Sequence, residues 1–536
     1  MFEKLNYTAS ATVMAAALLI AGTALADTVT QTAQTQRREA PPAELNQDRT
    51  GSPEHEGHQA PPEIDPAVRR VEHDADDYRP DPVYADEPYD VDAQLEIYGG
   101  KRAIDTPRPL LEFGYPQYRE GPFGTGHNLV GSKNLVRPQF LVYGDWRTAV
   151  AFNDNGNTEV GQVATRLNLD MDLKLTATER IHAFFRPLDQ AGKFTRYEFA
   201  GNDRNDADST DLIVDLNIEN LYFEGDLGAI QSGLTDEYTS YDLPFTFGLI
   251  PMFFQNGIWV DDAFLGAAFA LTAKNSRYLD ISNYDVTFFA GADKVSSAAL
   301  VDPGGALADH AGNVFGIVTF ADMQEGHLEA GWGYTQDTRS ESNSGDFSYH
   351  NFIAGWTKRY GGWLSNSVRG VWSVGQDPGG NRTQTADGVA LLVENSLVTH
   401  LPSTLVPYFN FFVGLDRPQP LARGGDGLLK NTGINFETDG LTGFPKLDDT
   451  ARDAWGGAIG VSYLFDLSRQ IVAEAATVQR MSNNPAAQND QYAVGLRYQF
   501  NIGGRDRWLM RTDAMYGFLE NAEDIAGARV EIRRKF

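Results

Sequence analysis

The apolar residues between about residue 138 and residue 536 alternate with small or polar ones. In residues 492–500, one alternate set is Tyr, Val, Leu, Tyr and Phe, and the other is Ala, Gly, Arg and Gln. Successive side chains of a β-strand point to opposite faces. Such a strand therefore has one apolar face with aromatic rings near its ends, and one small or polar face. A strand that faces lipid has this composition.

The same alternation recurs in residues 163–175, 455–465 and 508–516, and less regularly in residues 408–415. Charged residues occupy the middle of the minor face in several of these segments. A soluble β-sandwich rarely places Arg and Asp at mid-strand so often. The pattern therefore predicts an all-β fold, a transmembrane antiparallel up-and-down barrel, rather than a sandwich.

The predicted connections also alternate in length. Short polar turns, such as residues 176–179 and 466–469, alternate with long segments, such as residues 417–453. Outer-membrane barrels alternate short periplasmic turns with longer external loops in this way. With a first strand near residues 138–152, the pattern gives about 18 strands, with 16 as the alternative. An even number places both ends of the barrel in the periplasm.

The first 26 residues predict a secretory signal peptide. Lys4 precedes an apolar stretch over residues 13–25, which ends in Ala24-Leu25-Ala26. This stretch is too short to span a bilayer as a helix. The chain contains no cysteine, which excludes disulfides and thiolate metal sites. A closed barrel can instead be stabilised by backbone pairing on both sides of every strand.

Residues 27–100 differ from the rest of the chain. They contain 18 Asp and Glu against 6 Arg, a charge of about −12, and nine of the 25 prolines. Large apolar residues are too few to offset the entropy of ordering. We expect a disordered, acidic, Pro-rich periplasmic extension, followed by a transition segment over residues 101–137 and the barrel over residues 138–536. The net charge of −29 gives no reason to expect a nucleic-acid partner.

The last strand is the most specific single feature. Ala528, Val530, Ile532, Arg534 and Phe536 share one face, and the other face consists of Arg and Lys with Glu531. A terminal Phe after an alternating strand resembles the signal that the outer-membrane assembly machinery reads. The resemblance implies that this machinery binds Phe536, and that the barrel contacts membrane lipid and lipopolysaccharide.

Residues 138–536 resemble the large substrate-passing porins, including the alginate-export-like and other 18-stranded types. The resemblance depends on the alternation, the strand number and the ending, and the run over residues 219–228 is similar to strand–turn–strand runs of such porins. It implies an outer-membrane channel for small hydrophilic solutes. The alternative is a barrel scaffold or sheath that recruits a periplasmic protein through residues 27–100.

The alternation also predicts which charged side chains line the pore. These candidates are Arg166, Asp170, Asp172, Lys174, Glu474, Arg497, Arg511, Asp513, Arg529, Glu531 and Arg533. Arginine is concentrated in the last four strands. Either these residues form a basic track that favours anionic or polyhydroxylated solutes, or the charges of the lumen pair with one another and confer no selectivity.

Residues 236–262 form the candidate constriction loop. This segment combines large apolar residues, among them Leu243, Phe245, Phe247, Phe253, Phe254 and Trp259, with acidic ones, of which Asp236, Asp242, Asp261 and Asp262 are the candidates. An apolar loop of this length would be buried by folding into the barrel. The alternative is that residues 245–259 are further lipid-facing strand.

Signals for metals, cofactors and catalysis are weak. His55, His58 and His73 lie among carboxylates in the acidic extension, where a solvated tail accounts for them better than a metal site. The chain has no Gly-x-Ser-x-Gly elbow, and the adjacent pair Asp309-His310 has no triad context. We therefore expect no cofactor, no metal and no enzymatic activity, with a barrel hydrolase as the least favoured function.

Overall fold

The computed structural model describes residues 107–114, 126–190, 192–201, 209–216, 218–300, 312–339, 346–378, 383–402, 404–425, 427–466, 468–481, 489–502 and 507–536. All of them belong to the second of two compact units, Lys101–Phe536. The predicted signal peptide and the predicted acidic extension lie outside the described residues.

The described part of the chain is almost entirely β-structure. Its elements are β1 (Leu111–Gly114), β2 (Gln139–Asp154), β3 (Glu159–Lys174), β4 (Arg180–Phe185), β5 (Asp189–Gln190), β6 (Lys193–Gly201), β7 (Ser209–Asp211), β8 (Ile218–Asp226), α3 (Leu227–Thr235), β9 (Pro244–Phe254), η2 (Gln255–Gly257), β10 (Val260–Ser276), β11 (Ile281–Asp293), β12 (Gly312–Met323), β13 (Gly326–Asp337), β14 (Tyr349–Tyr360), β15 (Leu364–Val374), β16 (Asp387–Leu397), β17 (Leu405–Arg417), β18 (Ala422–Arg423), η3 (Ile434–Phe436), β19 (Ala454–Asp466), β20 (Arg469–Arg480), β21 (Gln491–Asn501), β22 (Trp508–Leu519) and β23 (Ile525–Lys535).

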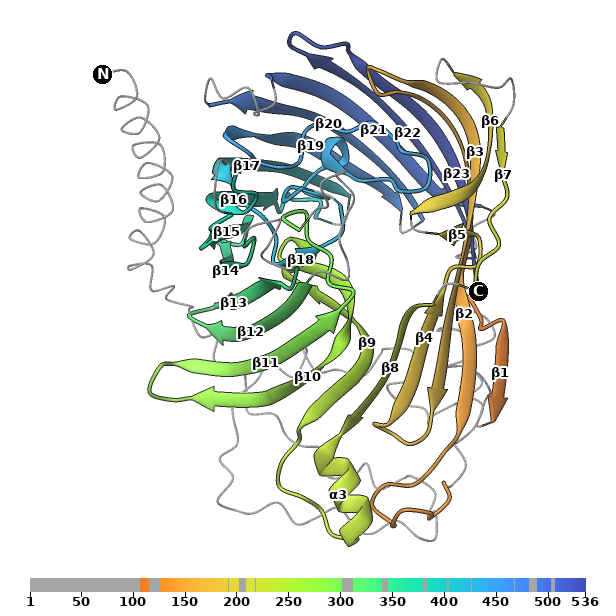
Figure 1. Cartoon of the computed structure of the whole chain (residues 1–536), viewed down its shortest axis with the longest axis vertical. Helices are drawn as coiled ribbons and strands as arrows, with labels where there is room; N and C mark the ends of the chain where they lie inside the picture. The colour runs from red at the N-terminus through yellow and green to blue at the C-terminus, as the bar shows by residue number, and fades with distance from the viewer. Residues whose placement is uncertain are drawn as a thin grey trace, which may run out of the picture. The chain divides into compact units, whose positions relative to one another are not determined.

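The strands form one closed antiparallel ring (Figure 1). Each strand from β9 to β17 pairs with the next in the chain, β17 pairs with β19, and β23 pairs with β2. Two positions of the ring are each filled by two shorter strands, one by β4 and β6 and the next by β7 and β8. The ring therefore has 18 positions, which confirms the predicted barrel and its strand number.

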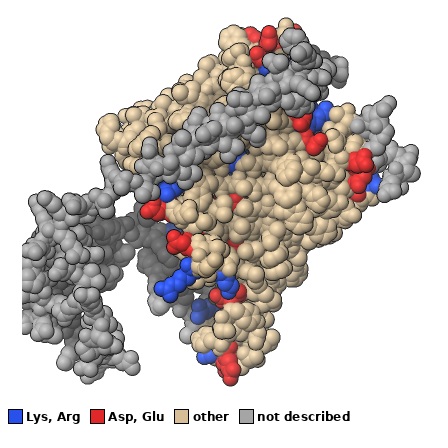
Figure 2. Space-filling view, turned by 90° about the vertical axis from the view of Figure 1, so that its left-hand side faces the viewer, with Lys and Arg blue, Asp and Glu red and all other residues tan. Residues whose placement is uncertain are grey.

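The outer face of the ring is apolar. In β19, Trp455, Ile459 and Phe465 are exposed, whereas Ala458 between them is buried. The same alternation exposes Tyr492 and Val494 in β21. On the face shown in Figure 2, most charged residues lie toward the edges of a broad uncharged area. Among the described residues, no helix is long and apolar enough to cross a membrane.

Short turns connect the strands at one end of the ring. Between β12 and β13 the turn consists of Gln324 and Glu325, both with left-handed backbone angles (φ 50° and 59°). Two such residues match the right-handed twist of a strand pair, so the hairpin stays in register. This end is the periplasmic one in outer-membrane barrels.

β1 lies in line with the last strand. The backbone N–H and C=O of Phe536 bond to Gly144 of β2, at 3.0 and 2.9 Å. Beyond this point β1 takes over as the partner of β2, from Leu111 opposite Val142 to Gly114 opposite Gln139. The end of β2 would otherwise have unpaired backbone groups, which are costly beside lipid. Part of the expected transition segment is thus a strand that completes the seam of the barrel.

Candidate functional site in the barrel interior

A long segment crosses the interior of the ring. Residues 418–453, which connect β17 to β19, are called the crossing segment here; it includes β18, labelled inside the ring in Figure 1. At one side, Asn351 of β14 donates to the carbonyl oxygen of Gln419 at 2.6 Å. At the other, Asn153 of β2 and Gln162 of β3 donate to the carbonyl oxygen of Thr442 at 2.6 and 2.7 Å. The sequence predicted an external loop here, and that prediction is wrong.

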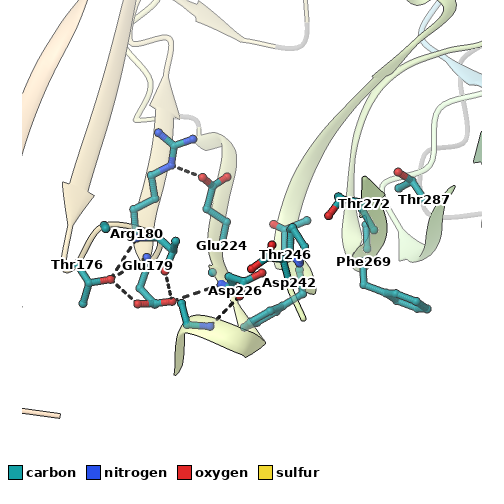
Figure 3. A pocket seen from close by; sticks show the side chains of 18 of the residues that line it. Thr176, Glu179, Arg180, Glu224, Asp226, Asp242, Thr246, Phe269, Thr272 and Thr287 are labelled. Atoms are coloured by element: carbon teal, nitrogen blue, oxygen red, sulfur yellow. Dashed lines mark hydrogen bonds and ion pairs between the residues drawn. The ribbon is translucent and has the colours of Figure 1, made fainter. Parts of the chain in front are cut away.

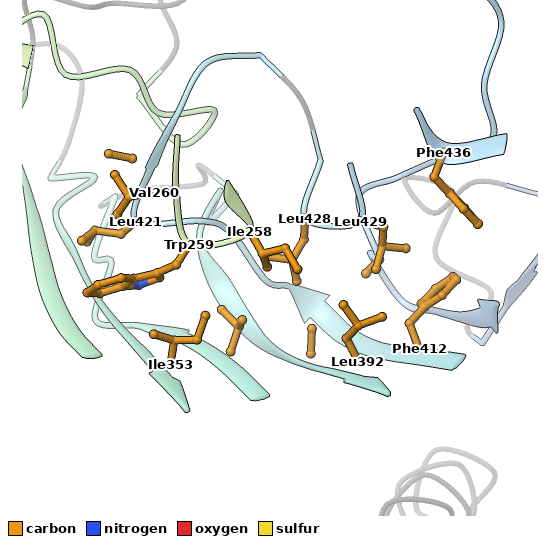
Figure 4. Packing of buried hydrophobic residues seen from close by; sticks show 14 of the residues in the cluster. Ile258, Trp259, Val260, Ile353, Leu392, Phe412, Leu421, Leu428, Leu429 and Phe436 are labelled. Atoms are coloured by element: carbon orange, nitrogen blue, oxygen red, sulfur yellow. The ribbon is translucent and has the colours of Figure 1, made fainter. Parts of the chain in front are cut away.

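Apolar packing holds the first half of the crossing segment. Its buried residues contact inward-facing residues of the wall in one cluster, drawn in Figure 4. The members labelled there are Ile258, Trp259, Val260, Ile353, Leu392, Phe412, Leu421, Leu428, Leu429 and Phe436. Full burial of one such side chain stabilises by about 1.5–3 kcal/mol. Several together favour the folded-in position of the segment over an external one.

A glycine in the wall allows the crossing segment to lie close against β13. A Cβ on Gly333 of β13 would lie 2.2 Å from a methyl carbon of Leu421. Next to it, the hydroxyl of Thr335 donates to the carbonyl oxygen of Leu421 at 2.8 Å, and the N–H of Leu421 donates to the carbonyl oxygen of Trp259 at 2.9 Å. The backbone of the crossing segment is therefore bonded to the wall where it enters the lumen.

Ion pairs hold the second half. Glu437 of the crossing segment accepts from Arg497 at 2.5 Å and from Arg511 at 2.6 Å. Asp439 lies 2.5 Å from Arg529. These arginines belong to β21, β22 and β23, and all three also contact Asp513, at 2.7 to 2.8 Å. The second half is thus fixed to the last strands by charge.

The carboxylate of Asp439 has a perturbed pKa. Burial alone would raise this pKa, but the charge of Arg529 and hydrogen bonds from Thr442 bring it below its ordinary value. Asp439 therefore stays ionised to a lower pH than an ordinary aspartate does, and its negative charge pairs with Arg529.

Glu474 of β20 holds the turn between the two halves. Its carboxylate accepts from the backbone N–H groups of Ile434 and Asn435, at 3.0 and 2.9 Å, and from the hydroxyl of Tyr408 at 2.6 Å. A Cβ on Gly433 would lie 2.6 Å from the same carboxylate. Glu474, a predicted pore-lining residue, thus acts as a cap for η3.

The other predicted pore-lining residues form two further groups. Around β2, Glu531 lies 2.7 Å from Arg147 and 3.3 Å from Arg533. Around β3, the nearest charged or polar partners are His182 for Asp170 at 3.5 Å, Arg180 for Asp172 at 3.4 Å, and Asn168 for Arg166 at 2.8 Å. Lys174 lines a cavity at the turn end of the ring. Asp172 and Glu531 thus pair with arginines, whereas Arg166 bonds to a neutral amide, and the effect of these residues on ion selectivity stays a prediction.

The candidate constriction loop is mostly strand. Within residues 236–262, β9 fills Pro244–Phe254 and exposes Phe247 and Phe253, as the lipid-facing alternative requires. The expectation of one long inward loop is therefore wrong. Only the turn between β9 and β10 points inward, where the indole of Trp259, fully buried, donates to Asn351 at 2.8 Å.

The four acidic candidates of that loop are separated by the length of β9. At the turn end, Asp236 ends α3 and accepts from Ser132 at 2.8 Å, and Asp242 lines the cavity. At the opposite end, Asp261 lies 3.3 Å from Lys430 of the crossing segment, and Asp262 accepts from the N–H of Ser296 at 2.7 Å. The first two therefore do not belong to the constriction.

Sequence reasoning missed the crossing segment although a signal was present. Leu428, Leu429, Phe436 and Leu447 lie in a segment expected to be in water. The argument that directed residues 236–262 inward, that an apolar loop buries itself, applies equally to them.

A cavity of about 930 Å³ lies at the turn end of the ring, between β4, β8, β9 and β10. Figure 3 shows Arg180 paired with Glu224 on one side and Thr246, Phe269 and Thr287 on the other. Glu179 lies next to Arg180 at the same side of the cavity. Burial would raise the pKa of Glu179, but hydrogen bonds from Thr176, Asn134 and Thr178 bring this pKa below its ordinary value. The cavity thus has a charged rim, formed by Arg180 and Glu224, and a flank that includes Phe269.

The part of the chain that the structure describes contains no group of three or more His, Asp or Glu arranged to hold a metal ion.

Comparisons with known proteins identify the fold. No family model and no curated protein matches the chain. Among solved structures, OccK7 (OpdD) of Pseudomonas aeruginosa aligns with a TM-score of 0.50 and 10% identity, over 74% of this chain and 98% of that one. OpdK of the same organism, solved with vanillate, aligns with a TM-score of 0.48 and 11% identity, over 74% of this chain and 98% of that one. Acinetobacter baumannii OccAB4 aligns with a TM-score of 0.48 and 9% identity, over 74% of this chain and 98% of that one. The chain therefore shares the barrel fold of OccK7, and the likeness to the large porins expected from the sequence is confirmed at the level of the fold.

Proposed function

We propose that the protein is an outer-membrane channel for small hydrophilic solutes, with the crossing segment as its constriction. One observation carries the proposal: a closed 18-position ring has an apolar outer face, a charged interior and a segment fixed across that interior. Only closed barrels and helices can cross a bilayer, because backbone groups in lipid must be paired. The described barrel fulfils this condition through its ladders.

The interior favours passage of polar solutes over catalysis. Its charges of both signs are placed as in water-filled barrels, where lumen residues set selectivity. The crossing segment passes through this polar space between opposite walls. We therefore place the constriction beside Glu437, whose side chain and arginine partners Arg497 and Arg511 keep some exposure to the lumen, whereas Arg529 and Asp439 are buried and anchor the segment.

Single-channel conductance of the full-length protein in planar bilayers tests the proposal. We expect stepwise ohmic currents. A variant in which a short Gly-Ser linker replaces residues 424–445 should conduct several-fold more, because the constriction is removed while the ring is kept. Resistance of the folded barrel to SDS at room temperature serves as the folding control. A folded barrel that carries no current, or equal currents from both proteins, would contradict the proposal.

The scaffold alternative concerns residues 27–100, outside the described residues. A protein partner bound there, the periplasmic location of the extension, and recognition of Phe536 by the assembly machinery remain predictions. Conductance of the chain with and without residues 27–100 separates the two functions. An open channel conducts equally in both forms, whereas a sheath conducts only after its partner is removed.

A further inference from the structure

The ring wall has a gap in the half of the barrel away from the short turns. The ladder between β8 and β9 runs from Asp226 opposite Pro244 to Leu221 opposite Leu249. Beyond it, residues 250–254 of β9 pair with β10 alone, and β7 pairs with β6 alone, among the residues that the structure describes. In Figure 1 these strands, β7 and β9, diverge from each other.

A bulge is the local cause. Opposite β4, Phe184 faces Asn220 and Phe185 faces Ile218, so Glu219 is an extra residue in β8. The bulge shifts the alternation of exposed and inward side chains by one residue. Leu221, with an odd number, is exposed on one side of the bulge, and Ile218, with an even number, is exposed on the other. Pro251, in β9 at the same level, has no N–H to donate. Bulges bend strands and occur at barrel rims and beside functional sites.

Apolar side chains border the gap on both sides. Leu212, Val214 and Leu216 are 73–80% exposed, and Phe253 on the β9 side is 63% exposed. The outer face of this ring is the lipid face, so these residues place the gap at the level of lipid rather than in water above it.

The cavity at the turn end adjoins the same strand. Met252 and Phe254 of β9 point to the interior and line the cavity, together with Ala268 of β10. Its opposite side carries the Arg180–Glu224 pair (Figure 3). One cavity thus offers a polar side and an apolar side, and the apolar side includes inward-facing residues of β9, the strand that borders the gap.

We propose that this cavity binds amphipathic solutes with a polar headgroup and a hydrocarbon tail, and that the gap between residues 212–216 and β9 lets the tail reach the lipid. The inference deepens the proposed channel function and rests on it. The headgroup lies beside the charged rim, and the tail contacts Met252 and Phe254. A solute without a tail gains nothing from the gap.

Block of the single-channel current by alkyl maltosides below their micellar concentration tests this proposal on the full-length protein. Maltose is the tail-free control. Each added CH₂ that is buried contributes about 0.8 kcal/mol, so the blocking concentration should fall about fourfold per CH₂. Equal block by maltose and by decyl maltoside would overturn the proposal. Absence of any current would instead count against the channel function itself.

Two variants locate the tail. Val214→Trp fills the gap from outside and should weaken the dependence on chain length, whereas Val461→Trp, a matched change on the outer face of β19, should leave it unchanged. Met252→Gln should weaken it from inside the cavity. Identical chain-length dependence in Val214→Trp and Val461→Trp would show that the tail does not pass the gap.

Discussion

Two regions of the wall are built in opposite ways. From β19 through β23 to β2, the ladders are regular and nearly continuous, and inward arginines pair with acidic residues of the crossing segment. From β4 to β9, two positions of the ring are interrupted, one strand carries a bulge, and a helix replaces a short turn. The ladders between β21, β22 and β23, which carry the charged contacts of the crossing segment, have no register shift, whereas β8 in the second region has one. The charged anchors of the crossing segment thus fall on the regular, rigid side of the wall.

The largest expected effect is on the rigid side. Arg529→Met leaves Asp439 without its buried partner and removes one of the three arginines that contact Asp513, and breaking a buried pair costs about 3–5 kcal/mol. Arg180→Met in the irregular wall removes pairs of a side chain that is 38% exposed, against 1% for Arg529, and should cost about 1 kcal/mol or less. Urea unfolding in lipid vesicles measures both. Equal losses would abolish the energetic distinction between the two walls.

Trp259 tests the apolar half of the crossing segment. Trp259→Ala should cost about 3–5 kcal/mol, because the fully buried ring packs against Leu421 and bonds to Asn351. Its loss should also loosen the constriction and raise open-channel noise. Phe253→Ala, on the outer face nearby, is the control and should leave the noise unchanged. A quiet Trp259→Ala channel would show that the charged anchors alone fix the segment.

Ion selectivity decides between the basic track and mutual pairing. Arg497→Ala with Arg511→Ala should shift the reversal potential in a salt gradient toward cation preference, and Glu437→Gln should shift it toward anion preference, because it removes the acidic partner of both arginines. Glu224→Gln, in the irregular wall, is the control. Unchanged selectivity in the double variant would eliminate the track.

The smallest expected effect is the response of the Asp439–Arg529 pair to low pH. The pKa of Asp439 is below its ordinary value of 3.8, so its pairing with Arg529 stabilises above about that pH and is lost as pH falls through the lowered pKa. Conductance noise of the wild type should therefore rise only at pH values below about 3.8. Asp439→Asn should be noisy at every pH. Acid-induced noise that persists unchanged in Asp439→Asn would assign the effect to another carboxylate.

The sequence predicted the ring well because its signal is local. Each strand exposes one face to lipid, so the alternation around Trp455 or Val494 can be read without any partner. The positions of Arg497, Arg511 and Arg529 followed from the same alternation. Their partners Glu437 and Asp439 did not, because a loop has no period and its direction depends on contacts with strands far away in the chain. The bulge at Glu219 was equally hidden, since it shows only in the register against β4.

The crossing segment also has a mechanical consequence. A ring of 18 strands is wide, and a thin cylinder of this kind flattens easily under uneven lateral pressure. The crossing segment is bonded to β14 at one end and to β2 and β3 at the other, on opposite sides of the circumference. It therefore acts as an internal strut: a membrane that squeezes the barrel must compress or stretch this segment, so the width of the aperture and the roundness of the barrel are set by the same bonds.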